Sequence, residues 1–107
     1  MTIQEISPVK LADLLQSSDN LVLLDVREDD ELQVCHLDFT HHIPLGELEE
    51  RLDELDKDDK IVVYCKMGGR SARAAQTLLD HGFSDVTNLT GGIIGWAKEV
   101  DPALPTY

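Results

Sequence analysis

The sequence predicts an α/β domain in which helices cover both faces of a parallel sheet. Two apolar segments, residues 21–26 and 61–64, have the continuous hydrophobic character of strands that are buried on both faces. Segments with helical character alternate with them along the chain, and this order produces right-handed crossovers between parallel strands. Ligands of such sheets bind beyond the carboxyl ends of the strands, so we expect the functional site at that edge.

The N-terminal half contains three predicted helices. Ser7 and Pro8 form a typical N-cap and first helical position, and the apolar residues that follow predict a helix that ends near Gln16. A short helix is expected over residues 29–34. Leucines spaced three and four residues apart predict an amphipathic helix over residues 44–55, with acidic residues on its outer face.

The C-terminal half continues the alternation. A helix is predicted over residues 71–80, and Gly82 is its expected C-terminal stop. A further short strand is predicted over residues 86–89 and a last helix over residues 93–100. Two prolines then predict an extended tail.

Length and composition indicate a single globular domain over residues 1–107. Hydrophobic residues make up 42% of the chain and charged residues 28%, which is typical of a folded domain with one core. No segment has the roughly 20 apolar residues of a membrane span, and the first residues lack the features of a signal peptide. Two cysteines are too few for a disulfide framework, so we expect a cytoplasmic protein.

The charge of the chain limits its partners. A formal net charge of −12, from 9 basic and 21 acidic residues, argues against binding to nucleic acid. It leaves basic partners open, although solubility alone explains such a charge. His36, His41 and His42 do not have the spacing of a metal site, and we expect neither a metal nor another cofactor.

The six residues Cys65–Arg70, read as Cys-Lys-Met-Gly-Gly-Arg, connect a predicted strand to a predicted helix. Glycines permit a tight turn, and the helix N-terminus presents unpaired N–H groups to the loop. Such surroundings lower the pKa of a thiol from about 8.5 into the range of roughly 3.5 to 7.5. The sequence therefore predicts a reactive thiolate at Cys65, held by backbone N–H groups from Lys66 to Ser71.

This loop resembles the active loop of the rhodanese family, Cys-x-x-Gly-x-Arg, which Cys65, Gly68 and Arg70 match. Four residues separate Cys65 from Arg70, whereas cysteine-dependent phosphatases have five at this place. The shorter loop makes a smaller bowl, which suits one extra sulfur better than a phosphate.

Two more segments resemble family motifs in the family's order. They are Leu23–Arg27 followed by Glu31, similar to an Asp-Val-Arg element, and Leu89–Trp96, similar to a Gly-Gly-x-x-x-Trp element. Residues 43–48 and 102–107 are similar to the rhodanese domain fused to enzymes that activate ubiquitin-like sulfur carriers. Residues 35–40 depart from the family's Gly-His-Ile-Pro-Gly-Ala, because only His36 matches it.

The resemblance implies a sulfurtransferase with a rhodanese-like fold and Cys65 as the catalytic residue. Its donor is expected to be a small anion such as thiosulfate or a persulfide-bearing protein, and a sulfur-carrier protein is a candidate partner. Two other functions stay open. A phosphatase or arsenate reductase is opposed by the loop length, and a non-catalytic interaction module is opposed by the intact loop residues.

The loop residues form the predicted substrate-binding group: Lys66, Met67, Gly68, Gly69, Arg70 and Ser71. Lys66 is equally compatible with attraction of an anionic donor and with a solvated surface lysine. Met67 is either an apolar lip over the site or an exposed side chain. Arg70 is expected to hold loop carbonyls or an acidic side chain while it adds positive potential.

Residues outside the loop have mainly structural predictions. Asp25, Arg27 and Glu31 are expected to form one ion pair that supports the loop from the neighbouring strand. Cys35 has no glycine turn or cation beside it, so it is predicted to be a packed thiol rather than a resolving cysteine. Trp96 is predicted to anchor the core.

Overall fold

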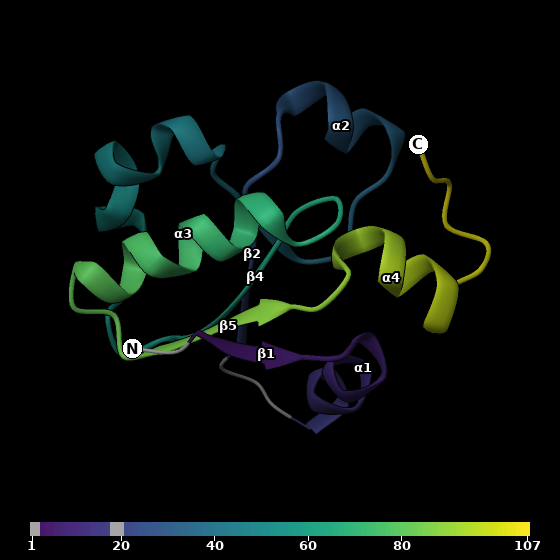
Figure 1. The fold of residues 1–107 in the computed structure, drawn as a ribbon, viewed down its shortest axis with the longest axis horizontal. Coiled ribbons are helices and arrows are strands. Elements are labelled where there is room, and N and C mark those ends of the chain that lie inside the picture. The colour runs from purple at the N-terminus through teal and green to yellow at the C-terminus, as the bar shows by residue number, and fades with distance from the viewer. Residues whose placement is uncertain (1–2, 18–20) are drawn as a thin grey trace.

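The computed structural model describes residues 3–17 and 21–107 of the chain. Its centre is a five-stranded sheet in the order β1-β5-β4-β2-β3, in which every neighbouring pair of strands runs parallel (Figure 1). The strands are β1 (Gln4–Ile6), β2 (Leu21–Asp25), β3 (Thr40–His42), β4 (Lys60–Tyr64) and β5 (Asp85–Leu89). The predicted parallel sheet is confirmed.

Helices cover both faces of this sheet, as predicted. They are α1 (Pro8–Ser17), α2 (Asp29–Val34), the 3₁₀ helix η1 (Leu45–Glu54), α3 (Gly69–Asp80) and α4 (Gly92–Glu99). Helices α1 and α4 pack against each other on one face, while α3 and η1 lie together on the other (Figure 1). Helix α1 begins directly after Ser7. The Ser7 side chain caps it, because its Oγ accepts a hydrogen bond from the Lys10 N–H at 3.2 Å.

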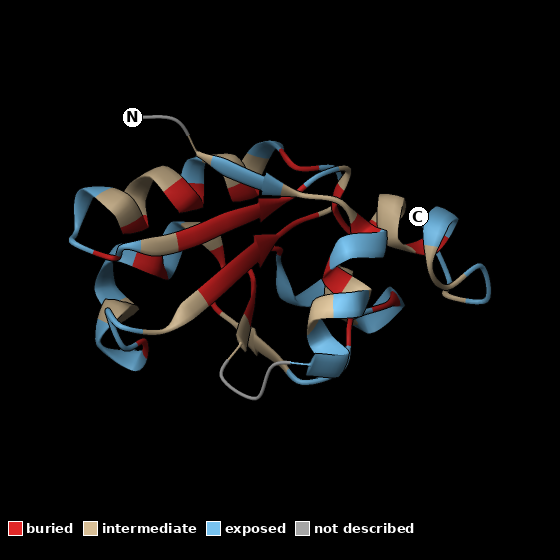
Figure 2. Cartoon of the chain, turned by 90° about the horizontal axis from the view of Figure 1, so that it is seen from below, coloured by how far each residue is buried: buried red, intermediate tan, exposed pale blue. Residues whose placement is uncertain are grey.

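The central strands are buried because both of their faces are covered (Figure 2). Alternate side chains of a strand point to opposite faces. Leu23 and Val62 accordingly join the core under α1 and α4, whereas Leu24 and Val63 join the core under α3 and η1. The sheet thus separates two apolar layers and holds β4, which leads to Cys65, between them.

The two edge strands were not predicted from the sequence. Both β1 and β3 are three residues long, and neither contains a buried residue. Short, polar strands of this kind are common at sheet edges, where they limit pairing with other chains. Their sequences carry no apolar run that would mark them.

The amphipathic helix predicted over residues 44–55 is present, but it is not an α-helix. The segment forms the 3₁₀ helix η1, with a kink at Arg51 (φ −120°, ψ 19°). Leucines spaced three and four residues apart suit either helix, because a 3₁₀ turn has three residues and an α turn 3.6. Arg51 pairs with Glu47 and Glu54 on this helix.

The segment that departs from the family pattern contains a strained residue. Phe39 has a φ of 60°, in the left-handed region, and its side chain is 100% exposed. It stands where the family pattern has its second glycine, which adopts this conformation without steric cost.

Among residues 3–17 and 21–107, no helix combines the length and the apolar character needed to cross a membrane.

Candidate active site

Cys65 directly follows β4 and lies at the carboxyl edge of the sheet, as expected. The chain then turns at Gly68, which has a φ of 113° and is the N-cap of α3. Of the two loop glycines, only Gly68 has a φ that favours glycine. Gly69 has no left-handed φ, and a Cβ there would meet no atom within 4 Å. Helix α3 begins at Gly69, two residues before the predicted start at Ser71.

The Cys65 sulfur is enclosed by hydrogen-bond donors. The Gly68 N–H donates to Sγ at 3.1 Å and the Ser71 N–H at 3.4 Å, while the Ser71 hydroxyl lies 3.4 Å from the same atom. Cys65 is only 1% exposed. The loop therefore provides the predicted cradle of N–H groups around a nearly buried sulfur.

These donors shift the pKa of the Cys65 thiol below its ordinary value. Burial is the largest single effect and raises the pKa, because it disfavours the charged form. Hydrogen bonds from the Ser71 hydroxyl and from the N–H groups of Ser71, Gly68 and Met67 lower it, and together they outweigh burial. The geometry thus favours the nucleophilic thiolate.

Asn88, on β5, holds two residues of the cradle, and the sequence did not predict it as a site residue. Its Oδ1 accepts a 2.5 Å hydrogen bond from the Ser71 hydroxyl, and its Nδ2 donates to the Gly68 carbonyl at 3.3 Å and to Glu5 at 3.2 Å. The available signal was a polar side chain near the end of a buried strand adjacent to β4. The single hydroxyl proton of Ser71 has three acceptors within reach, namely Asn88 Oδ1, the Gly68 carbonyl at 3.2 Å and the sulfur, so the N–H groups are the permanent donors to Cys65.

Helix α4 holds the outer side of the loop. The Ile93 N–H donates to the Cys65 carbonyl at 2.9 Å, and the Ile94 N–H donates to the Lys66 carbonyl at 3.2 Å. Gly92 makes this approach possible, since it has a φ of 60° and a Cβ there would lie 2.6 Å from the Cys65 carbonyl oxygen. The glycines of the Leu89–Trp96 motif therefore let the start of α4 approach and hydrogen-bond the loop backbone.

Arg70 is held by an acidic side chain rather than by loop carbonyls. Its two terminal nitrogens donate to the two carboxylate oxygens of Glu31 at 2.5 and 2.8 Å. This bidentate contact lowers the pKa of Glu31 to about 2. The prediction that Glu31 would join the Asp25–Arg27 pair as an ion-pair partner was wrong, because its carboxylate faces Arg70.

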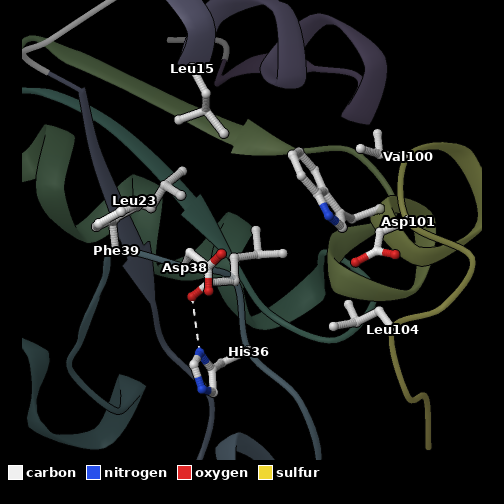
Figure 3. Close-up of a pocket in the computed structure, with 10 residues that line it drawn as sticks. Leu15, Leu23, His36, Asp38, Phe39, Val100, Asp101 and Leu104 are labelled. Carbon is white, nitrogen blue, oxygen red and sulfur yellow. Dashed lines mark hydrogen bonds between the residues drawn. The ribbon is translucent and has the colours of Figure 1, made fainter.

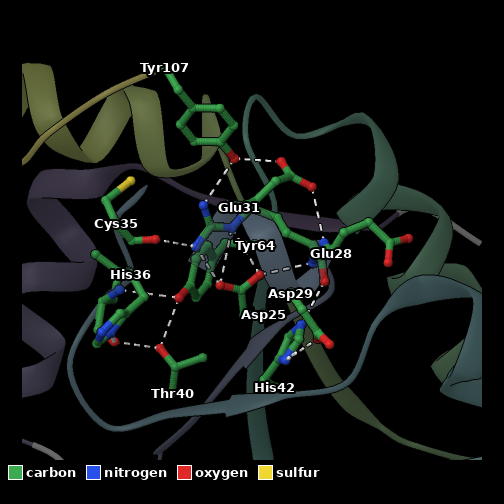
Figure 4. A network of polar contacts seen from close by, with 12 residues as sticks. Asp25, Glu28, Asp29, Glu31, Cys35, His36, Thr40, His42, Tyr64 and Tyr107 are labelled. Atoms are coloured by element: carbon green, nitrogen blue, oxygen red, sulfur yellow. Dashed lines mark hydrogen bonds and ion pairs between the residues drawn. The ribbon is translucent and has the colours of Figure 1, made fainter. Parts of the chain in front are cut away.

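Asp25 and Arg27 form a fully buried ion pair at the end of β2 (Figure 4). Three nitrogen–oxygen contacts of 2.7 to 3.1 Å join their side chains. Arg27 also donates to the Cys35 carbonyl at 2.8 Å. A buried ion pair is stable only when its remaining N–H donors are also hydrogen-bonded. Here the remaining Arg27 donor to Cys35 holds the chain after α2 against β2, the strand beside β4.

Tyr107 completes this cluster and was not predicted as a site residue. Its hydroxyl donates to Glu31 Oε2 at 2.5 Å and accepts a 2.9 Å hydrogen bond from Arg27 (Figure 4). Burial, followed by the contact with Glu31, raises the pKa of Tyr107 to about 12, so its proton stays in place. The ammonium of Lys66 lies 4.5 Å from the centre of its ring.

In the part of the chain that the structure describes, the other side chains singled out from the sequence make no hydrogen bond to the Cys65 sulfur. Met67 is 69% exposed on the loop surface, and Cys35 is a buried free thiol, in line with a packed role. Trp96 packs against the core under α1 and α4 while it stays partly exposed. In the described ranges 3–17 and 21–107, no group of three or more His, Cys, Asp or Glu side chains is arranged to hold a metal.

A separate hollow of about 440 Å³ lies away from the loop (Figure 3). Leu15 of α1, Leu23 of β2, Trp96 of α4, residues 36–39 and the segment after α4 line it, and no residue of Cys65–Ser71 takes part. The candidate site is therefore the loop Cys65–Ser71 around the sulfur and not this hollow.

Comparisons with known proteins agree with this geometry. The family described as "Rhodanese-like domain" matches residues 7–99. The chain is similar to a sulfurtransferase from Allochromatium vinosum, with 32% identity over 102 residues that cover 95% of each protein. A rhodanese-related protein from Thermoplasma volcanium has the same fold, with a TM-score of 0.82 and 32% identity over 91% of this chain and 93% of that one.

Some relatives are much longer. The chain is 40% identical over 104 residues to MoeZ of Mycobacterium tuberculosis, which covers 95% of this chain and 26% of MoeZ. The chain thus spans about a quarter of that relative. With a family match over most of its length, and with the family's loop folded around Cys65, the chain belongs to the rhodanese family.

Proposed function

We propose that the protein is a sulfurtransferase that carries a sulfane sulfur as a persulfide on Cys65. The observation that carries this proposal is the set of N–H donors directed at a single, nearly buried sulfur. Its membership of a family with sulfurtransferase members supports the same conclusion. Thiosulfate, or the persulfide of a partner protein, is the proposed donor.

In the first step the Cys65 thiolate attacks the outer sulfur of the donor. A bond forms between Sγ and that sulfur, and the S–S bond of thiosulfate breaks with its electron pair on the departing sulfite. The products are a Cys65 persulfide anion and sulfite, so atoms and charge balance. This is covalent catalysis in two steps.

The loop stabilises the persulfide anion. A hydrogen bond to a charged group is worth about 1.5 to 3 kcal/mol, whereas a helix dipole supplies at most ~2 kcal/mol. The N–H groups of Gly68 and Ser71 are therefore the main source of stabilisation, and α3 adds to it through its N-terminus. Arg70 contributes less charge than its type implies, because Glu31 neutralises it.

In the second step a nucleophilic acceptor attacks the outer sulfur of the persulfide. Cyanide or a thiolate takes the sulfur in this way and releases the Cys65 thiolate. Towards the C-terminus of a sulfur-carrier protein that has been activated as an acyl adenylate, the persulfide is itself the nucleophile: its outer sulfur bonds to the carbonyl carbon and AMP leaves. A carrier protein is the proposed macromolecular acceptor, since residues 43–48 and 102–107 are similar to rhodanese domains that are fused to carrier-activating enzymes.

Mass spectrometry of the intact protein after mixing with thiosulfate tests this function. We expect a gain of one sulfur atom on Cys65 that cyanide reverses. Cys65→Ser should abolish the gain and the turnover, while Cys35→Ser should retain most of both, because only Cys65 has the N–H cradle. Equal losses in the two variants, or a Cys35–Cys65 disulfide in place of the persulfide, would contradict the proposal.

A further inference from the structure

Among the described residues, the loop Cys65–Ser71 contains one cation that forms no ion pair with a carboxylate. Arg27 is paired with Asp25, and Arg70 is paired with Glu31. Within residues 3–17 and 21–107, Lys66 takes part in none of the ion pairs. Since Lys66 is the neighbour of Cys65 in the chain, it is the loop side chain whose charge is available to an incoming anion.

Lys66 is placed by an aromatic ring that comes from the far end of the chain. Its ammonium lies 4.5 Å from the centroid of the Tyr107 ring, which is within the range of a cation–π contact. An unpaired lysine side chain otherwise has many rotamers, and a contact with a ring face restricts them. Tyr107 thus limits where the Lys66 charge can lie.

Tyr107 is itself held in position by two charged groups. Its hydroxyl bridges Glu31 and Arg27, and Glu31 in turn holds Arg70 at the start of α3. Arg27 is fully buried and anchored by Asp25. The ring is therefore fixed to residues that also contact the loop, while 37% of Tyr107 stays exposed.

We propose that Tyr107 is a specificity-determining residue that positions the Lys66 ammonium to receive the sulfonate end of a dianionic donor such as thiosulfate. This inference rests on the proposed function. As the S–S bond of thiosulfate breaks, negative charge accumulates on the departing sulfite, so a cation near its oxygens assists both binding and departure. A donor with fewer charges gains less from the same cation.

Two donors with the same outer sulfur provide the test: thiosulfate, a dianion, and methanethiosulfonate, a monoanion in which a methyl group replaces one oxygen. Each passes its outer sulfur to Cys65 and leaves as sulfite or methanesulfinate. The measured quantity is the ratio of kcat/KM for thiosulfate to kcat/KM for methanethiosulfonate. This ratio cancels a general loss of active protein.

Three variants separate the ring from the hydroxyl and from the charge. Tyr107→Leu should lower the ratio roughly 2- to 5-fold, mainly through KM for thiosulfate, which is the range of an exposed cation–π contact. Tyr107→Phe keeps the ring and should keep more of the ratio than Tyr107→Leu. Lys66→Gln should lower the ratio at least as much as Tyr107→Leu.

The double variant Lys66→Gln/Tyr107→Leu distinguishes positioning from mere support of the fold. If Tyr107 acts through Lys66, adding Tyr107→Leu to Lys66→Gln lowers the ratio no further. Lys57→Gln is the matched control for the loss of one positive charge, because Lys57 is exposed and lies near Gly82, at the opposite edge of the sheet.

Two results would overturn the inference alone: an unchanged ratio in Tyr107→Leu, or the same fall in the ratio whether or not Lys66 is present. An unmodified protein that gains no sulfur on Cys65 from either donor would instead refute the sulfurtransferase function, and the inference with it.

Discussion

At the scale of single residues, the reactivity of Cys65 depends on neighbours that differ in how replaceable they are. Backbone N–H groups cannot be removed by a side-chain substitution, but the Ser71 hydroxyl can. It lies 3.4 Å from the sulfur and lowers the pKa of Cys65. It also donates to Asn88 and to the Gly68 carbonyl, so its loss affects three partners.

We expect Ser71→Ala to raise the pKa of Cys65, because a donor to the thiolate is lost while burial remains. The rate of alkylation of Cys65 by iodoacetamide, measured across pH, should shift to higher pH. At neutral pH the rate should fall by at most about 10-fold, which is what one full hydrogen bond to a charged group is worth, because Ser71 shares its proton with other acceptors. A profile identical to that of the unmodified protein would mean that the N–H groups alone set the pKa.

Gly92 is the least replaceable residue of the site backbone. A Cβ there would overlap the carbonyl groups of Cys65 and Lys66, and a φ of 60° strains any other residue. Gly92→Ala should lower the free energy of unfolding by at least about 3 kcal/mol.

Urea denaturation measures this change, and Gly46→Ala is the control. A Cβ at Gly46 would meet no atom within 4 Å, so that variant should change the free energy of unfolding by less than about 1 kcal/mol. Equal effects of the two substitutions would show that the approach of α4 to the loop is not close in solution.

The site residues differ in how far the sequence could predict them. Cys65, Gly68 and Ser71 were predictable because local chain geometry, a strand followed by a turn and a helix, brings them together. Tyr107 and Asn88 were not, because they reach the site only through tertiary packing. Neither residue has a local pattern that identifies its partner.

At the scale of elements, α2 and the start of α3 are joined by the Glu31–Arg70 pair. Glu31 has a pKa of about 2 in the folded protein against an ordinary 4.5, chiefly because of its hydrogen bonds with Arg70. A carboxyl group with a depressed pKa stabilises the fold above its unfolded pKa, and this contribution is lost as the pH falls through the folded value. The window therefore lies between about pH 4.5 and pH 2.

We expect Glu31→Gln to be less stable than the unmodified protein at about pH 6, by on the order of 1–2 kcal/mol after solvent screening. The difference should shrink as the pH falls through the window, since the unmodified protein then loses the same charge. Urea denaturation at several pH values measures it. Glu50→Gln, on the exposed side of η1, should show no such pH dependence.

The length of the loop between β4 and α3 gives a second test at this scale. Insertion of one glycine between Gly69 and Arg70 produces the spacing of cysteine-dependent phosphatases, and we expect weaker sulfur transfer together with admission of phosphate or arsenate analogues. Activity with thiosulfate and hydrolysis of an aryl phosphate measure the two effects. Unchanged sulfur transfer would mean that loop size does not determine the chemistry.

Among the elements, those with an apolar pattern were predictable and those without one were not. Strands β2, β4 and β5 have buried faces that require hydrophobic side chains, and the helices have apolar faces that match. Strands β1 and β3 exist because a neighbouring strand offers backbone partners, which is a property of the sheet and not of their own residues. The kink in η1 at Arg51 likewise has no counterpart in the spacing of the leucines.

At the scale of the whole molecule, the formal net charge of −12 means that acidic side chains repel one another across a small domain. Exposed charges repel over distances that salt screens, with a Debye length of about 10 Å at 0.1 M. We expect the Tm to rise when sodium chloride is increased from about 0.01 M to about 0.3 M. A Tm that falls over this range would mean that attractive pairs such as Arg51 with Glu47 dominate the charge energy.

The pairing of β1 with β5 also affects the order in which the protein can become active. Gln4 pairs with Thr87, so β1 has no partner in the sheet until β5 has been synthesised. Glu5 on this strand holds Asn88, and Asn88 holds Ser71 beneath the Cys65 sulfur. The contacts of Asn88 and Glu5 beneath the sulfur therefore form only after β5 has been synthesised, and a nascent chain that stops short of Asn88 lacks them although its loop already contains the N–H donors of Gly68 and Ser71.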